Sequence, residues 1–248
     1  MGPAFETEDP MKFLQALNEI YVRGGKDCPE MSVTAIKQAL QLSLPGSVIY
    51  VFTDAEAKDH RVLPDVIQLI REKEIRVNFV LTGTCGLKPY ESPVGPHTYE
   101  TIATTSSGQI VNLNKSEVNK IWKFVELSIS SKRKSIFSGD KLTRGKYTYV
   151  VVVQPLLDQI IVTASAENVQ LTIRDGGGRL VYPGDNGVEE LFRVRSSVSV
   201  LIRSPEAGNW SFTVDSINGR QMLRVEGISS QWRKVRGKHT VVVISGTV

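Results

Sequence analysis

Cysteine is scarce in this chain, and Cys28 and Cys85 are the only two among its 248 residues. Two cysteines are too few for a disulfide scaffold, and their spacing does not match a zinc site. The three histidines are scattered, and none has a cysteine or a carboxylate at catalytic spacing. No nucleophile–base pair and no glycine-rich phosphate loop occurs, so the sequence predicts a protein that is not an enzyme.

Long apolar runs are also missing, since no stretch approaches the ~18 residues that a membrane span requires. The first eight residues have no basic start and no apolar core, and therefore do not form a signal peptide. Positive charge is in slight excess, with 30 Lys and Arg against 26 Asp and Glu. The dense basic runs, at 131–134 and 233–236, are not interleaved with aromatics. We expect no membrane span and no nucleic-acid partner.

What the chain does contain is ordinary globular composition, with 41% hydrophobic and 23% charged residues. Residues 1–131 alternate helix-like and strand-like segments, which predicts a parallel sheet with helices on both sides. Strands are expected at 48–52, 75–81 and 109–113. Helices are expected to begin near residues 10, 29, 61, 97 and 114, the last with Asn114 as its N-cap.

The pattern changes after residue 131. Residues 132–146 are polar and basic, and we expect them to form a linker. Residues 147–248 contain many short β-rich segments, the last at 239–245, separated by turn sequences such as Gly176-Gly177-Gly178. Short strands with regular turns are typical of an antiparallel β-sandwich, so this part is expected to form a second domain.

Several polar loops of the first half fall at one edge of the expected parallel sheet. Ligands collect at the carboxyl ends of parallel strands, where the loops at 24–30, 52–55 and 81–86 lie. Two of these loops contain the carboxylates of Asp27, Glu30 and Asp54. Oxygen ligands on loops suit a hard cation, magnesium or calcium. The alternative is that these carboxylates only cap the helices and turns that follow.

Four loop motifs of this half resemble the von Willebrand factor A domain of the hemicentins, in order and in spacing. They are Gly-Gly-Lys-Asp-Cys-Pro-Glu-Met, Leu-Pro-Gly-Ser-Val-Ile-Tyr-Val-Phe-Thr-Asp-Ala, Val-Leu-Thr-Gly-Thr-Cys and Thr-Ser-Ser-Gly-Gln. Asp-x-Pro-Glu and Phe-Thr-Asp-Ala also resemble, more distantly, loops of integrin β subunits. The resemblance covers nearly all of residues 1–131, and the β-rich remainder is similar through weaker motifs.

This resemblance implies a secreted, extracellular adhesion or matrix protein that binds matrix or cell-surface proteins. It also implies a metal-ion-dependent adhesion site at the rim of the sheet, where a cation binds an acidic group of the partner. By the same resemblance, Asp54 is a ligand of the adhesion-site cation. Glu30 is shared with a neighbouring cation site, and Asp27 assists at that second site.

The chain departs from the family pattern because the Asp-x-Ser-x-Ser loop does not occur in it. We therefore expect a partial doubly wound α/β domain, its C-terminal half, followed by the β-sandwich. The remaining carboxylates should hold magnesium weakly and calcium somewhat better. The strand at 48–52 should have a bare edge, which invites self-association unless another element covers it. The alternatives are a structural spacer with an inactive rim and an intracellular adaptor with reduced cysteines.

Two further features concern covalent chemistry. Cys28 and Cys85 lie on two loops that share the rim, and we predict a disulfide between them; two separate buried thiols are the alternative. The triplets Asn114-Lys115-Ser116 and Asn209-Trp210-Ser211 fit the glycosylation acceptor pattern, which also arises by chance. The missing signal peptide leads us to expect that an N-terminal part precedes this chain.

Overall fold

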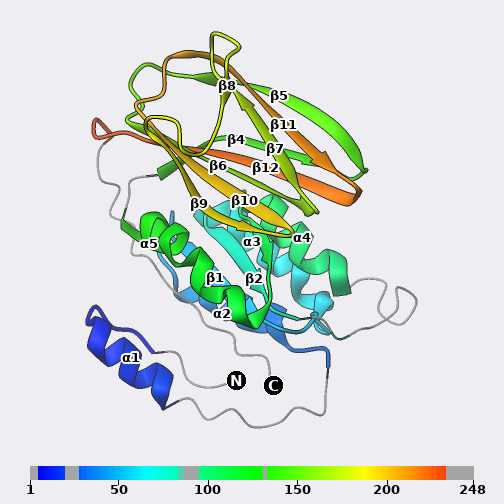
Figure 1. The fold of residues 1–248 in the computed structure, drawn as a ribbon. Coiled ribbons are helices and arrows are strands. Elements are labelled where there is room, and N and C mark those ends of the chain that lie inside the picture. Colours follow the sequence, from blue (N-terminus) through cyan, green and yellow to red (C-terminus); the bar gives the residue numbers. More distant parts are fainter. Residues whose placement is uncertain (1–4, 20–27, 84, 86–94, 131–132, 233–248) are drawn as a thin grey trace.

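The structure is a computed structural model that describes residues 5–19, 28–83, 85, 95–130 and 133–232. It contains a three-stranded parallel sheet and two antiparallel sheets, of five and four strands (Figure 1). The parallel sheet belongs to the N-terminal half of the chain and the antiparallel sheets to the C-terminal half. This arrangement confirms the predicted fold class, an α/β unit followed by a β-sandwich.

The parallel-sheet lobe comprises the described residues up to 130. Its strands lie in the order β1-β2-β3 and pair in parallel, from Val48↔Arg76 to Thr53↔Leu81 in the first pair. Short apolar runs bounded by turns form these strands, as expected for strands buried on both faces. The elements of this lobe are α1 (Pro10–Asn18), α2 (Ser32–Leu42), β1 (Val48–Thr53), η1 (His60–Val62), α3 (Leu63–Lys73), β2 (Arg76–Leu81), α4 (Gly95–Thr105), β3 (Ile110–Asn112), η2 (Lys115–Ile121) and α5 (Trp122–Ser130).

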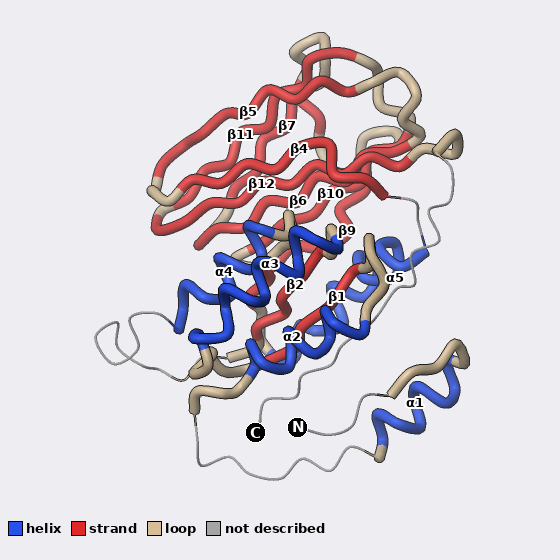
Figure 2. Tube along the Cα trace, turned by 180° about the vertical axis from the view of Figure 1, so that it is seen from behind, coloured by secondary structure: helices blue, strands red, loops and turns tan. Residues whose placement is uncertain are grey.

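Successive residues of β1 pack into different cores, because side chains of a strand alternate between its faces. Ile49 and Val51 join the cluster formed with α2, α3 and α4. Tyr50 joins a second cluster, which contains Phe124 and Val125 of α5 together with apolar residues of the sandwich. Figure 2 shows α2, α3 and α4 on one side of the sheet and α5 on the other. The sandwich therefore covers part of the face that α5 leaves open.

The β-sandwich contains one sheet in the order β4-β12-β6-β10-β9 and another in the order β5-β11-β7-β8. Its core lies between the sheets, where Trp210, Phe212 and Val214 of one strand point inward. The five-stranded sheet faces the parallel-sheet lobe, and the four-stranded sheet is the outermost layer (Figure 1). The strands are β4 (Arg133–Lys141), β5 (Gly145–Val153), β6 (Gln159–Glu167), β7 (Gln170–Arg174), β8 (Leu180–Val181), β9 (Val188–Val194), β10 (Ser197–Arg203), β11 (Gly208–Ser216) and β12 (Asn218–Ile228).

The linker expected at 132–146 is wrong over 133–141, which form β4 and pair with β12 in antiparallel fashion, and at 145–146, where β5 begins. This segment is polar and basic in sequence, yet Ile136 and Phe137 of the strand pack against the sandwich core. Its hydrogen-bonding partner lies some eighty positions later, so no local pattern indicates the pairing. The strand expected at 239–245 lies outside the described residues.

The two lobes meet along a buried polar seam, formed by Arg76, Gly108 and Gln109 on one side and Arg224 and Glu226 on the other. The Arg224 guanidinium donates from Nε to the Gly108 carbonyl at 3.1 Å. The Gln109 side chain accepts from Ser165 Oγ at 3.1 Å and donates to the Thr163 carbonyl at 3.4 Å. These bonds satisfy polar groups that packing of the lobes removes from water.

Candidate functional site

The carboxyl ends of β1 and β2 come together at the rim of the parallel sheet. The Thr82 amide donates to the Thr53 carbonyl at 3.0 Å, and the Ala55 amide donates to Thr53 Oγ1 at 3.3 Å. These bonds set the turn that carries Asp54. A Cβ atom on Gly83 would lie 3.0 Å from the Asp54 backbone oxygen, so the two loops approach closely because Gly83 has no side chain.

Asp54 lies at this rim, as the sequence predicts, with a side chain that is 18% exposed. Its Oδ2 lies 3.5 Å from the ammonium nitrogen of Lys115, at the start of η2. Its Oδ1 is buried and has no hydrogen-bond partner among the described residues. Asp54 therefore presents one carboxylate oxygen to a cationic side chain and a second that the described protein leaves unsatisfied.

Glu30 is held by its backbone on the loop before α2. Its amide donates to the Glu56 carbonyl at 2.8 Å, and its carbonyl accepts from the Lys58 amide at 2.8 Å. The result is an isolated parallel bridge between Glu30 and Ala57. Asp27 lies outside the described residues. The metal-binding roles of Asp27, Glu30 and Asp54 therefore stay predictions.

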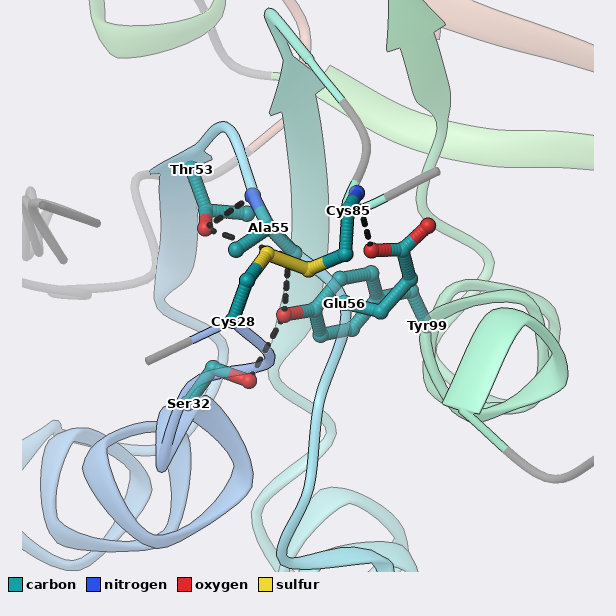
Figure 3. The surroundings of a disulfide bond; sticks show 7 residues. All are labelled: Cys28, Ser32, Thr53, Ala55, Glu56, Cys85 and Tyr99. Carbon is teal, nitrogen blue, oxygen red and sulfur yellow. Dashed lines mark hydrogen bonds between the residues drawn. A yellow bond between two sulfur atoms is a disulfide. The ribbon is translucent and has the colours of Figure 1, made fainter. Parts of the chain in front are cut away.

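The predicted disulfide between Cys28 and Cys85 is confirmed, with Cα atoms 5.6 Å apart (Figure 3). The Glu56 carboxylate lies beside it and accepts a hydrogen bond from the Cys85 amide at 2.6 Å. Of the described residues, Cys28, Glu56 and Cys85 form the one group of His, Cys, Asp and Glu ligand atoms within 4.8 Å of one another. Because the disulfide uses both sulfurs, this group is no metal site. Within the part of the chain that the structure describes, Glu30 and Asp54 belong to no such group.

Beneath the disulfide, a buried tyrosine ties the rim to two helices (Figure 3). Tyr99 Oη of α4 donates to the Ala55 carbonyl at 2.9 Å and lies 2.7 Å from Ser32 Oγ of α2. Burial raises the pKa of Tyr99 to about 12, and the hydrogen bond with Ser32 offsets this only in part. The phenol therefore stays protonated and keeps donating. No local sequence pattern indicates this role of Tyr99, since its partners are 44 and 67 positions away.

Asp59 is a second residue that sequence reasoning missed. Its carboxylate accepts from the Val33 amide at 3.1 Å and from the Thr34 amide at 2.6 Å. It thus caps the N-terminus of α2 from a position 26 residues later in the sequence, where a local N-cap is absent. This contact fixes the helix that follows the loop of Cys28 and Glu30.

The two acceptor triplets differ in surroundings. The Asn114 side chain accepts from the backbone of Glu117, while the Glu117 carboxylate accepts from the Asn114 amide at 3.1 Å. This capping box confirms the expected N-cap, although the helix begins with the 3-10 segment η2. Asn209 is exposed near the start of β11. Glycosylation of either residue stays a prediction.

Comparison with known proteins places these features in a family. The von Willebrand factor A domain family matches residues 1–115. Over 231 residues, 93% of the chain, the sequence is 42% identical to Hemicentin-1 from Homo sapiens and 39% identical to Hemicentin-2 from Mus musculus. It is 31% identical over 239 residues, 92% of the chain, to von Willebrand factor A domain-containing protein 7 from Mus musculus.

The chain spans only a small part of these relatives, 4% of each hemicentin and 26% of the third protein. The hemicentin match extends through both lobes, since it covers far more than the parallel-sheet lobe alone. Among the described residues, no helix has both the length and the apolar character needed to cross a bilayer. Residues 1–115 thus form a von Willebrand factor A domain segment, and the chain belongs with the hemicentin-like proteins of this family.

Proposed function

We propose that this chain is an extracellular adhesion or matrix module that binds protein partners at the carboxyl rim of its parallel sheet. Similarity to the hemicentins over both lobes supports a binding role rather than catalysis. The disulfide between Cys28 and Cys85 supports an oxidising location, because such bonds persist outside the cytosol.

The observation that carries this proposal is the buried Oδ1 of Asp54, which has no hydrogen-bond partner among the described residues. A buried carboxylate oxygen without a partner is costly and is retained mainly where function needs it. A divalent cation binds such an oxygen, and the position of Asp54 at the end of β1 matches the family's adhesion site.

The described residues supply too few oxygens for a closed shell, because calcium takes six to eight ligands and magnesium requires octahedral geometry. We propose that Asp54 and Glu30, together with the Asp27 that the sequence predicts for a neighbouring site, form half of a site that an Asp-x-Ser-x-Ser loop outside this chain completes. When bound, the cation would supply an open coordination position for an acidic side chain of the partner protein.

A second candidate function, the structural spacer, is favoured by one contact. The Lys115 ammonium lies 3.5 Å from Asp54 Oδ2, where its charge opposes a second cation. If the chain is a spacer, Lys115 neutralises the Asp54 carboxylate at a rim that binds no metal. The substitution Lys115→Met distinguishes the adhesion module from the spacer, because it should raise the affinity for a cation only if the rim is a cation site. Lys120, which pairs with Glu117, provides the matched control substitution.

The experiment is a partner-binding assay with the chain joined to added first strands that carry an Asp-x-Ser-x-Ser loop. Extracellular matrix proteins are immobilised, and binding is measured with magnesium and calcium and again with a chelator. We expect binding that the chelator and Asp54→Ala both abolish, whereas Asp215→Ala on the sandwich leaves it unchanged. Binding that is insensitive to both the chelator and Asp54→Ala would leave the spacer as the better account.

A further inference from the structure

The outer face of the four-stranded sheet carries an exposed apolar strip. Val150 and Val152 of β5 are 64% and 66% exposed, and Leu156 beyond the strand is 55% exposed. β5 lies at the end of the strand order β5-β11-β7-β8. A contiguous exposed apolar strip invites association with other chains, and soluble proteins usually keep such patches small or covered.

An acceptor triplet lies directly beside this strip. In the register of β11 with β5, Asn209 is opposite Val152 and Ser211 is opposite Val150. Residues opposite each other share one face of a sheet, with Cβ atoms about 4.5–5.5 Å apart. Trp210 between them is buried, and its Nε1 donates to the Glu206 carbonyl at 2.8 Å. The amide of Asn209 and the hydroxyl of Ser211 therefore belong to the outward face, beside the two valines.

The side chain of Asn209 is exposed, and two glycines border it on the side away from β5. On the side away from β5, Gly176 approaches so closely that a Cβ atom on it would lie 3.2 Å from the Cα atom of Gly208 and 3.6 Å from the Asn209 amide nitrogen. Both glycines lack side chains, so neither crowds the outward face. Asn209 is exposed, whereas its neighbour Trp210 anchors the strand.

In the other acceptor triplet, the side chains of the asparagine and the lysine already make structural contacts. The Asn114 side chain caps η2, and the adjacent Lys115 is paired with Asp54 at the rim. Loss of an N-cap destabilises a helix, so a modification that rotates this side chain would be opposed by the fold. The structure thus separates two triplets that are equivalent in sequence.

We propose that Asn209 is N-glycosylated and that the first sugars of the glycan cover Val150 and Val152. The Nδ2 atom of Asn209 forms a bond with C1 of the sugar. The bond between C1 and the oxygen of a lipid-linked oligosaccharide pyrophosphate breaks, the lipid pyrophosphate leaves, and the amide loses one proton. The glycan covers the exposed apolar strip with a solvated surface. This inference rests on the extracellular location proposed above.

The site is tested by secreting the full chain from mammalian cells behind a cleavable signal peptide. Glycans are then removed enzymatically in heavy-oxygen water, which converts each modified asparagine to labelled aspartate. We expect label at Asn209 and none at Asn114. The glycan should be lost in Asn209→Gln and in Ser211→Ala but retained in Asn114→Gln. An unmodified Asn209 in a secreted chain whose disulfide is intact would overturn the inference.

The shielding role needs a separate readout, the fluorescence of a dye that binds apolar surface. Enzymatic removal of the glycan should raise the fluorescence, and Val150→Thr with Val152→Thr should abolish that rise. A glycan whose removal leaves dye binding unchanged would contradict the shielding. Partner binding at the rim is measured independently. Glycosylation of Asn209 without cation-dependent partner binding would therefore count against the proposed function alone. Cation-dependent partner binding without glycosylation of Asn209 would count against this inference alone.

Discussion

Glu226 of β12 forms an ion pair with Arg76 at the start of β2, although 150 positions separate them in sequence. Arg133 pairs with the other carboxylate oxygen of Glu226 at 2.8 Å. Burial alone would raise the pKa of Glu226, but the two guanidinium groups outweigh it and hold the pKa below its usual value. The two lobes thus share a buried charge cluster, in which Arg76 of the parallel-sheet lobe is paired with Glu226 only while the lobes are packed together.

Replacement of Glu226 by glutamine should destabilise the protein strongly, because it leaves Arg76 and Arg133 without their counter-charge. Removing one partner of a buried ion pair typically costs about 3–5 kcal/mol. Urea unfolding measures the free energy. The control is Asp65→Asn, which breaks the solvent-exposed pair with Lys37 and should cost at most about 1 kcal/mol. Similar small effects for both variants would show that the seam does not hold the lobes.

The same cluster predicts how stability depends on pH. The pKa of Glu226 in the folded state is lower than its usual 4.5. A group with a depressed pKa stabilises the fold above its unfolded-state pKa, and this contribution is lost as the pH falls through the folded-state value. We expect the free energy of unfolding to decline below about pH 4.5. Glu226→Gln should flatten that decline in urea titrations at several pH values, and an unchanged slope would contradict the assignment.

Much of the rim could be predicted from the sequence, because the ends of parallel strands meet at one edge. That rule places Cys28 near Cys85 and Asp54 at the end of β1, as the structure has them. The partners of these residues could not be predicted. Lys115 reaches Asp54 from 61 positions away, and the contact depends on the register of β3 and the course of η2.

The secondary structure, too, could be predicted only in part. Helices and strands with strong periodicity were predicted close to their observed bounds, since burial of one face determines their pattern. β4 was not predicted because polar residues such as Lys134 and Ser135 are typical of a linker. Its pairing with β12 is decided by tertiary contacts. Asp59 and Tyr99 were missed for the related reason that their roles exist only between distant segments.

The disulfide yields a prediction for stability. It joins residues 57 positions apart, and closing a loop of this length restricts the unfolded chain by about 4 kcal/mol. Cys28→Ser with Cys85→Ser should lower the free energy of unfolding by a similar amount in urea titrations. Thiol titration of the denatured, non-reduced protein should detect no free thiol. Two free thiols in each chain would instead indicate a reducing location and the intracellular adaptor.

The edge of the parallel sheet leads us to expect self-association. β1 ends the strand order β1-β2-β3 among the described strands, and α1 lies apart from the sheet in both views (Figures 1 and 2). Met11 and Leu14 of α1 are 71% and 51% exposed. Sedimentation should show oligomers that grow with concentration, because an open edge pairs with other chains. A monomer at all concentrations would mean that another element covers the edge.

The central claim, that the rim is half of a cation-dependent adhesion site, is tested most directly by calorimetric titration with magnesium. The chain alone should bind magnesium weakly or undetectably, since Asp54 and Glu30 do not form a closed shell. Addition of the first strands with their Asp-x-Ser-x-Ser loop should raise the affinity steeply, and Asp54→Ala should abolish that gain. Tight binding by the chain alone, or no gain in the extended chain, would contradict the account.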